Sequence, residues 1–322
     1  MQIMSKTFAE LGRVAAINEL FKGTGYEPFT EPLFFRSEAD EHITTVSKVM
    51  LEGIDFDLVY FPLKHLGYKS VVAVTGEFYA VRSTPVALSV ILGISAKLDF
   101  GQIEELWSGV VAAAKEFGYS GLSLDLQPSK NGLSISLAAT GSETASMARP
   151  MAKSMDLICV GGRLGAAYFG QQVLEHKADD LEKHKMMLAS YLKPELDPAT
   201  LSQLLQSGVD PSFGYFVNRG LGDAVLRLCR DSGLGVKIYA EKIPFEGGSI
   251  SLGKEMDIDP ISAAMNGGDD YVLMYVIPSA QFEAFSREFK TFEVIGHLAR
   301  PEVGAVLVTP DGLEHPISSQ GW

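Results

Sequence analysis

Cysteine is scarce in this chain of 322 residues, which has only Cys159 and Cys229. Neither belongs to a Cys-x-x-Cys pair, so the sequence shows no zinc ribbon and no disulfide framework. Histidine is also sparse, with six residues, and none has the spacing of a zinc-protease helix. These shortages exclude the common zinc-dependent and disulfide-stabilised classes.

Basic side chains are outnumbered. The chain has 27 Lys and Arg against 40 Asp and Glu, which gives a net charge of −13 and a sequence pI of about 4.9. Nucleic-acid-binding domains normally carry a basic surface, so we expect no nucleic-acid partner. A local basic pocket can still exist on an acidic protein, and an anionic small-molecule ligand is compatible with this charge.

Long apolar runs are missing as well. No stretch reaches the length of a membrane-spanning helix. The first twenty residues contain neither a long apolar segment nor a cleavage pattern. We therefore expect a cytoplasmic protein that does not contact the membrane.

What the chain does contain is enough apolar sequence for real cores. Hydrophobic residues make up 46% and charged residues 21%. The length suggests about two domains, and we place them at 1–142, a nucleotide-binding and dimerisation domain, and 143–322. Helical and strand patterns mix in both halves, which predicts an α/β or mixed α+β fold.

In the first half, the pattern predicts a helix over 63–81, a strand over 84–95 and an amphipathic helix over 99–118. The segments 121–127 and 132–141 read as an antiparallel pair joined by the intervening turn. In the second half, 156–162 reads as a strand that ends in Gly-Gly. It is followed by one helix to residue 193, and a later helix over 223–233 is closed by Gly233.

The stretch Asn266–Ile277, NGGDDYVLMYVI, combines a turn signal with a strand signal. Asn-Gly-Gly favours a turn, and Val272–Ile277 is an apolar, β-branched run typical of a buried strand. Asp269 and Asp270 lie between the two. They are either part of a ligand site or the polar residues of the turn, where Asp is common for local reasons.

Seven strings resemble the thiamine-monophosphate kinase branch of the aminoimidazole-ribonucleotide-synthetase-type superfamily, in family order over nearly the whole chain. They are FAELG (8–12), LEGIDFDLVYFPLKHLGYKS (51–70), YAVRSTP (79–85), DLICVGGRLGAAYFG (156–170), NGGDDYVLMYV (266–276), VIGHLARPE (294–302) and QGW (320–322).

This resemblance implies a two-domain fold whose N-terminal sheet forms a barrel across a homodimer. It implies transfer of the γ-phosphoryl group of ATP to thiamine phosphate, which gives thiamine diphosphate. Aspartates of the family hold several Mg²⁺ ions that neutralise the phosphates, since phosphoryl transfer depends on positioning and charge stabilisation.

Several of the family's aspartates are replaced here. Pro32, Lys48, Phe216 and Arg219 stand where the resemblance places metal-binding acids. The acids that remain as candidate metal ligands are Glu31, Glu77 and Asp125. Because Mg²⁺ requires close octahedral oxygen coordination, this set is expected to hold at most one weakly bound ion.

Other family positions suggest ligand contacts. On the nucleotide or anion side, the candidates are Lys48, Asp125, Arg149 and Arg219. On the substrate side, they are Asp55, which replaces a family histidine, Asp269 and Trp322. The hydroxyl residue of the family's glycine-rich turn is replaced by Gly161, beside Gly162.

The sequence therefore predicts a kinase-like protein whose catalysis is impaired or lost, and which acts as a homodimer that binds a phosphate-bearing small molecule. The alternatives are an active kinase with fewer Mg²⁺ ions and an ATP-dependent enzyme with a changed substrate. Lys48 and Arg219 either bind an anion in place of the metal or pair with leftover acids such as Glu31 and Asp125.

Overall fold

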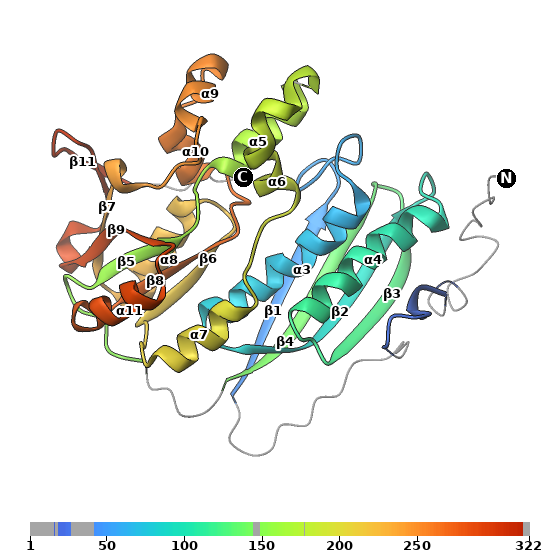
Figure 1. Ribbon diagram of the computed structural model, residues 1–322, viewed down its shortest axis with the longest axis horizontal. Helices are drawn as coiled ribbons and strands as arrows, with labels where there is room; N and C mark the ends of the chain where they lie inside the picture. Colours follow the sequence, from blue (N-terminus) through green and yellow to red (C-terminus); the bar gives the residue numbers. More distant parts are fainter. Residues whose placement is uncertain (1–15, 17–18, 27–41, 144–148, 177, 318–322) are drawn as a thin grey trace. The chain divides into compact units, whose positions relative to one another are not determined.

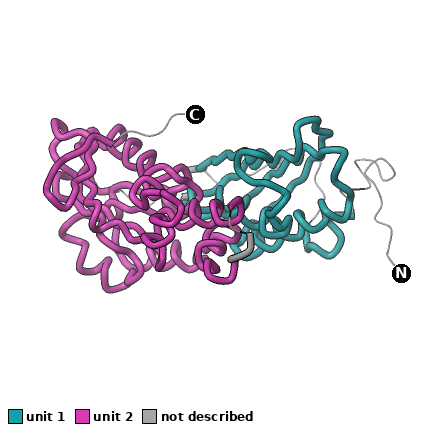
Figure 2. The backbone as a smooth tube through the Cα atoms, turned by 90° about the horizontal axis from the view of Figure 1, so that it is seen from above, with its two compact units in different colours: residues 1–78, 83–145 teal, residues 79–82, 146–322 magenta. Residues whose placement is uncertain are grey.

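The computed structural model describes residues 16, 19–26, 42–143, 149–176 and 178–317. The chain divides into two compact units, coloured separately in Figure 2. Unit 1 comprises residues 1–78 and 83–145, and unit 2 comprises residues 79–82 and 146–322. Each unit packs helices against a β-sheet (Figure 1), which confirms the predicted mixed α/β fold class.

In the part of the chain that the structure describes, unit 1 is a four-stranded sheet of order β1-β4-β2-β3 with helices against one face (Figure 1). Its elements are β1 (His42–Leu51), α3 (Leu63–Ala80), β2 (Thr84–Ser95), α4 (Phe100–Glu116), β3 (Gly121–Ser129) and β4 (Ser134–Glu143). The two helices and β2 match their predicted ranges closely.

The predicted pairing of 121–127 with 132–141 is wrong. β2 lies between these strands and pairs with β3 in parallel and with β4 antiparallel. The reason is the helix that precedes β3. Parallel neighbours need a long crossover connection, and α4 supplies it, so the chain returns to one edge of β2 and leaves the other edge to β4.

The two faces of the unit 1 sheet differ in character. Leu88, Val90 and Leu92 of β2 are buried on the face that carries the helices. On the opposite face, which no described element covers, alternate positions expose Ile43, Val49 and Ile91. The strand alternation of period two separates these two sets.

The helices α3 and α4 approach each other at two glycines. A Cβ on Gly67 would lie 2.0 Å from the carbonyl oxygen of Leu106, and one on Gly109 would lie 1.9 Å from that of Lys64. Neither position has room for a side chain unless a helix backbone moves. This contact fixes the distance between the two helices.

Unit 2 is built, within the described residues, on a seven-stranded mixed sheet of order β11-β10-β7-β9-β5-β8-β6. Its strands are β5 (Leu157–Gly161), β6 (Phe213–Val217), β7 (Gly235–Tyr239), β8 (Val272–Ile277), β9 (Phe292–Ala299), β10 (Ala305–Val308) and β11 (Glu314–Pro316). Its α-helices are α5 (Ala166–His176), α6 (Lys185–Leu192), α7 (Ala199–Ser207), α8 (Leu221–Ser232), α9 (Ser249–Met256), α10 (Pro260–Asn266) and α11 (Phe282–Glu288). Short 3₁₀ turns are η1 (Ala178–His184), η2 (Ala240–Lys242), η3 (Ser279–Gln281) and η4 (Pro301–Val303).

The predicted single helix up to residue 193 is also wrong, because α5 and α6 are separate and η1 lies between them. The charged sequence of η1, ADDLEKH, has no apolar stripe that could hold a continuous helix against a core. In addition, a Cβ on Gly170 of α5 would lie 2.1 Å from the carbonyl oxygen of Met187. The missing side chain lets α6 pack closely against α5.

Two local predictions in unit 2 are confirmed. All six residues of β8 are buried, as its apolar run indicates. Helix α8 ends at Gly233, whose φ of +65° is the left-handed conformation that glycine adopts readily at a helix end. Across the described residues, none of the helices has both the length and the apolar character needed to cross a membrane.

We predict that Gly109→Ala destabilises unit 1. The added methyl group would overlap the Lys64 carbonyl, and overpacking of this kind typically costs about 1–3 kcal/mol. Urea unfolding followed by circular dichroism measures the change. Gly247→Ala is the control, because a Cβ there meets nothing within 4 Å. Equal stability of the two variants would show that the helix contact tolerates a side chain.

Candidate functional site

Three loops of unit 2 meet at one edge of its sheet. β8 pairs with β5 on one side and with β6 on the other, and Gly161 and Val217, the last residues of those strands, both pair at the beginning of β8. The segments 161–165, 218–220 and 266–271 therefore leave the sheet next to one another. We refer to them as the strand-end loops.

Hydrogen bonds join two of the strand-end loops directly. The amide of Asp269 donates to the carbonyl of Asn218 at 3.0 Å, and the amide of Tyr271 donates to that of Val217 at 2.9 Å. Arg219 follows Asn218 and is exposed, and Asp269 is half-buried. The structure thus brings together two residues that the sequence assigned to an anion and to a substrate.

The backbone of this turn is strained. Asp269 has a φ of +58° and Tyr271 a φ of +50°, so two non-glycine residues on either side of Asp270 are left-handed. Each such residue typically costs about 1 kcal/mol or more, and the cost persists only where the surroundings impose it. Strain of this kind is frequent at functional sites and marks the turn as a candidate.

The constraint comes from Asp270, whose carboxylate is buried. It accepts hydrogen bonds from the amide of Gly165 at 2.8 Å and from that of Ala167 at 3.3 Å. These are amides at the N-terminus of α5, where a helix has unpaired donors and favours negative charge. Asp270 is therefore a helix cap delivered from another element. Of the two adjacent acids, Asp270 is thus held by the fold, whereas Asp269 is half-buried.

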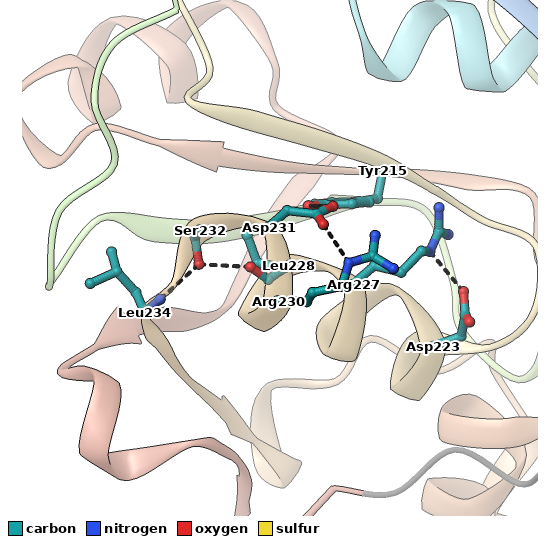
Figure 3. A network of polar contacts seen from close by, with 8 residues as sticks. All are labelled: Tyr215, Asp223, Arg227, Leu228, Arg230, Asp231, Ser232 and Leu234. Atoms are coloured by element: carbon teal, nitrogen blue, oxygen red, sulfur yellow. Dashed lines mark hydrogen bonds and ion pairs between the residues drawn. The ribbon is translucent and has the colours of Figure 1, made fainter.

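The loop that carries Arg219 is fixed by contacts along α8 (Figure 3). Tyr215 of β6 donates its hydroxyl to Asp231 at 2.9 Å, and Asp231 also accepts from Arg230 at 2.6 Å. Arg227 pairs with Asp223 at 2.9 Å and lies over the Tyr215 ring at 5.2 Å. Arg227, in the middle of α8, and Asp231, near its end, thus contact Tyr215 and hold the helix against β6, the strand that precedes the loop.

The protonation of this network follows from its geometry. Burial raises the pKa of the Tyr215 hydroxyl, and its hydrogen bond to Asp231 raises it further. The hydrogen bond from Arg230 lowers the pKa of Asp231. Asp231 therefore stays ionised and Tyr215 stays neutral around neutral pH. The hydrogen bonds that stabilise the loop thus do not change with protonation in this range.

The Gly161-Gly162 turn is closely packed. A Cβ on Gly161 would lie 2.5 Å from the ring of Phe292, and one on Gly162, whose φ is +135°, would lie 2.5 Å from Val272. The glycines are thus required by neighbouring side chains. Position 161, where the resemblance expects a hydroxyl group, has no space for one beside the Phe292 ring.

Arg149 lies elsewhere in unit 2. It is exposed, and its Nη2 donates to the carbonyl oxygen of Val81 at 3.0 Å. Arg82, which is buried and has a φ of +62°, pairs with Asp210 at 2.6 Å. Both arginines secure residues 79–82 to unit 2. This contact adds a structural use for Arg149 to the nucleotide contact that the resemblance implies.

The remaining predicted residues with a described structure belong to unit 1. Lys48 of β1 is aligned with Leu137 of β4, on the sheet face that carries α3 and α4. Asp125 of β3 is aligned with Ile91 on the opposite face. The strands therefore separate Lys48 from Asp125, and the predicted alternative of a salt bridge between them is wrong.

The candidate metal ligands are not gathered by the fold either. Glu77 is on α3, whose Phe78 packs beside Gly141 on the helix-bearing side of the sheet. Asp125 is on the other side, where its carboxylate accepts from the amide of Leu126 at 2.9 Å and from Gln127 at 3.1 Å. The two acids do not fit one shared Mg²⁺ ion. Among the described residues no group of three or more His, Cys, Asp or Glu side chains could hold a metal.

Three predicted residues remain. Asp55 folds back on its own loop and accepts from the amide of Leu51 at 2.8 Å. Glu31 and Trp322 lie outside the described residues, so their assignments stay predictions. Lys48 belongs to unit 1, whereas Arg149 and Arg219 belong to unit 2.

Sequence reasoning missed two contributors to this site. The first is the ion pair between Asp223 and Arg227. Their i, i+4 spacing is typical of a helical ion pair and could have predicted it from the sequence. The stacking of Phe292 on Gly161 left no local signal, because the two residues are 131 positions apart in the sequence.

We predict that Asp270→Asn changes how stability depends on pH. Burial raises the pKa of Asp270 to about 7, while the hydrogen bonds from Gly165 and Ala167 act in the opposite direction. The folded chain then keeps a proton that the unfolded chain releases above about pH 4, so this contribution to stability is lost as the pH rises toward 7. In urea unfolding, the variant should be less stable than the wild type at pH 5, with a smaller difference at pH 8.

The control for losing a helix cap is Asp259→Asn, because Asp259 is exposed and caps α10 through the amides of Ile261 and Ser262. A difference between wild type and Asp270→Asn that stays constant with pH would contradict the assigned protonation of Asp270.

Comparison with known proteins finds no matching family model. It does find curated relatives along most of the chain. Thiamine-monophosphate kinase of Pyrococcus horikoshii is 25% identical over 257 residues, which cover 80% of this chain and 78% of that one. The enzyme of the same name from Aquifex aeolicus is 21% identical over 281 residues, or 87% and 89% of the two chains.

Solved structures show the same fold. The structure of AaThiL complexed with AMPPCP and TMP superposes with a TM-score of 0.73 at 20% identity and covers 97% of this chain and 99% of that one. The hydrogenase maturation protein HypE superposes with a TM-score of 0.69 at 16% identity, covering 91% and 92%. The sequence matches and the superpositions show that this chain is similar to thiamine-monophosphate kinases along most of its length and has their fold.

Proposed function

We propose that this chain binds a phosphate-bearing small molecule with fixed cations in place of a magnesium cluster, and that its activity as a kinase is impaired or lost. The observation that supports the proposal is the position of Arg219, which lies beside Asp269 in the strand-end loops. It stands where the family resemblance expects a metal-binding acid, and no acid among the described residues pairs with it.

A guanidinium group can replace part of the electrostatic effect of a metal ion. It attracts phosphate oxygens without a carboxylate cage, and its planar fork binds two of them at once. The exposed position of Arg219 leaves this fork open to solvent, and the brace along α8 holds its loop in place. Lys48 of unit 1 likewise has no ion-pair partner in the described part of the chain.

The fate of the other family positions supports loss of the magnesium chemistry. Phe216 is fully buried, and its ring lies 5.6 Å from that of Tyr271. That position has become part of the core and offers no metal ligand. The separation of Glu77 from Asp125 by the unit 1 sheet removes a second set of donors. Mg²⁺ needs several oxygen ligands at short, regular distances.

The class of ligand is taken from the relatives. AaThiL is complexed with AMPPCP and TMP, which names a phosphate-bearing ligand class for the shared fold. For this chain we infer only that class. An active kinase that uses fewer Mg²⁺ ions, or an enzyme with a changed substrate, would differ from our proposal in turnover and in metal dependence.

We further propose that the partner of unit 1 is a second copy of this chain. The uncovered face of its sheet exposes Ile43, Val49, Leu51 and Ile91. Between these apolar side chains lie small residues such as Ser89 and Ala138, which let another surface approach closely. An exposed apolar patch on a sheet, with edge strands on either side, favours association. A self-complementary contact would cover the patch on both copies.

We predict that phosphate stabilises the protein without metal. In EDTA, inorganic pyrophosphate at millimolar concentration should raise the melting temperature, because a ligand that binds only the folded state stabilises it by mass action. Arg219→Asp should abolish the shift. Arg300→Asp is the matched control and should retain it, because exposed Arg300 follows the end of β9 that lies beside the beginning of β5, away from the strand-end loops.

Two results would contradict this function. One is a pyrophosphate shift that requires Mg²⁺. The other is transfer of the γ-phosphoryl group of ATP to thiamine phosphate at about one turnover per second or faster, a rate within the ordinary range of enzymes. Binding in EDTA with turnover near background supports the proposal.

The predicted assembly is tested in solution. Light scattering at micromolar concentration should report a dimer, and Ile91→Asp should shift it toward the monomer because a charge would be buried in the contact. Ile250→Asp, at an exposed isoleucine of α9 in unit 2, is the control and should leave the dimer intact. A monomeric wild type would refute the homodimer.

A further inference from the structure

Unit 2 contains a pocket of about 380 Å³ that includes none of the ligand residues predicted from the sequence and described by the structure. It lies between the end of η1, the beginning of α6 and the beginning of α9, and we refer to it as the α6–α9 pocket. Its volume is in the range of small-molecule sites, about 300–1,000 Å³.

The floor of the α6–α9 pocket is aliphatic. Met187 and Leu252 line it, are buried, and belong to the small core that includes Phe169 of α5. Met186 also lines the pocket and is exposed. None of the described lining residues is Phe, Tyr or Trp. Because methionine side chains adapt their shape to flexible apolar groups, this floor suits an aliphatic chain better than a flat ring.

Bases predominate at the rim, although the chain as a whole is acidic. Lys183, His184 and Lys185 line the pocket, and Glu255 is the one acid among its described lining residues. Lys185 also pairs with Glu182 at 2.5 Å in an exposed contact, and Lys183 and Glu255 have further interactions. Exposed ion pairs contribute little stability, so a lysine can exchange such a contact for a bound anion at small cost. The rim therefore favours an anion over a cation.

The N-terminus of α9 lies at this pocket without a side-chain cap. The chain enters the helix through Gly247 and Gly248, which line the pocket and present no side chain to it. Gly248 has a φ of +91°, a conformation that favours glycine. The nearby carboxylate of Glu246 accepts from the amide of Gly247 at 2.9 Å and does not line the pocket.

Polar groups in the first turn of α9 remain available to a ligand. The amides of Ser249 and Leu252 donate to backbone carbonyls, whereas those of Ile250 and Ser251 have no acceptor among the described residues. Ser249 is fully buried, and its hydroxyl has no hydrogen-bond partner in the described part of the chain. Unsatisfied donors at a helix N-terminus favour a negatively charged acceptor from outside the helix. They therefore act in the same direction as the bases of the rim.

We propose that the α6–α9 pocket binds an aliphatic chain that ends in an anionic group, such as a short acyl carboxylate or an alkyl phosphate. The aliphatic chain packs on Met187 and Leu252, where its surface is removed from water. The anionic group faces the basic rim and the first turn of α9. Because Arg149, Arg219 and Asp269 do not line this pocket, the site is separate from the proposed phosphate site.

The test compares probes that differ in charge or in chain length. Hexanoate and hexyl phosphate are anions, hexanol is neutral, hexylamine is a cation, and acetate is an anion without the long chain. Each is titrated into the full chain in EDTA by isothermal titration calorimetry. We expect hexanoate and hexyl phosphate to bind at least about tenfold more tightly than the other three probes, a difference of about 1.4 kcal/mol.

Two variants locate the site. Ser251→Asp adds a carboxylate to the lining at the first turn of α9, where an acid is compatible with the helix. Lys183→Gln removes one base of the rim. Each should weaken hexanoate binding by about threefold or more, in line with the contribution of one partly exposed charge. Lys254→Gln, at an exposed lysine of α9 outside the lining, is the control and should have no effect.

A third variant separates this site from the proposed phosphate site. Arg219→Asp removes the cation on which the pyrophosphate experiment depends, and hexanoate should bind this variant as tightly as it binds the wild type. Loss of hexanoate binding in Arg219→Asp would place the probe at the strand-end loops and overturn the inference. Failure of the pyrophosphate experiment has no effect on the expected result here.

The remaining outcomes are also decisive. A tenfold preference for either hexyl anion that is weakened by Ser251→Asp or Lys183→Gln supports the proposal. Equal binding of hexanoate and hexylamine overturns it, because the rim would then not select charge. Equal binding of hexanoate and acetate overturns it as well, because the aliphatic floor would not contribute. Hexanoate binding that is unchanged in both lining variants places the probe elsewhere and has the same consequence.

Discussion

The two hydrogen bonds that the buried carboxylate of Asp270 accepts from the N-terminus of α5 are the constraint on which the site depends. They join the beginning of β8 to the turn after β5, two segments separated by more than one hundred residues. By fixing residue 270, they hold Asp269 and Tyr271 in left-handed conformations that neither would adopt readily by itself. They also occupy the amide donors at the beginning of α5 with a side chain of the protein itself.

Three positions of unit 2 differ from what the family resemblance expects. Where related proteins are expected to carry acids, this chain has Phe216 in its core and Arg219 at its surface. Where a hydroxyl group is expected, Gly161 accepts the ring of Phe292. Each replacement puts an aromatic ring, a cation or a glycine where the resemblance expects a polar group. The fold is retained because β8, α8 and the helix cap do not depend on the changed residues.

Local patterns in the sequence were sufficient to predict an element wherever the pattern lies within that single helix or strand. The buried run of β8, the stripe of α4 and the C-terminal glycine of α8 all have their expected form. Predictions failed where the partner of a segment lay far along the chain. β3 and β4 look like a hairpin, yet the crossover through α4 places β2 between them. The helix after Gly165 looks continuous, yet close packing at Gly170 lets α6 turn back along α5.

The sequence by itself indicated the family resemblance and the mixed α/β class, and it has Lys48, Phe216 and Arg219 where that resemblance expects acids. Residue identity and order along the chain are enough for those conclusions. Only the tertiary structure decided which residues share a site. It placed Lys48 and Asp125 on opposite faces of one sheet. It also placed Arg219 beside Asp269, which is half-buried, and made the adjacent Asp270 a buried helix cap. The physical reason is that strand register and helix packing, which arise from contacts between distant segments, set the direction of each side chain.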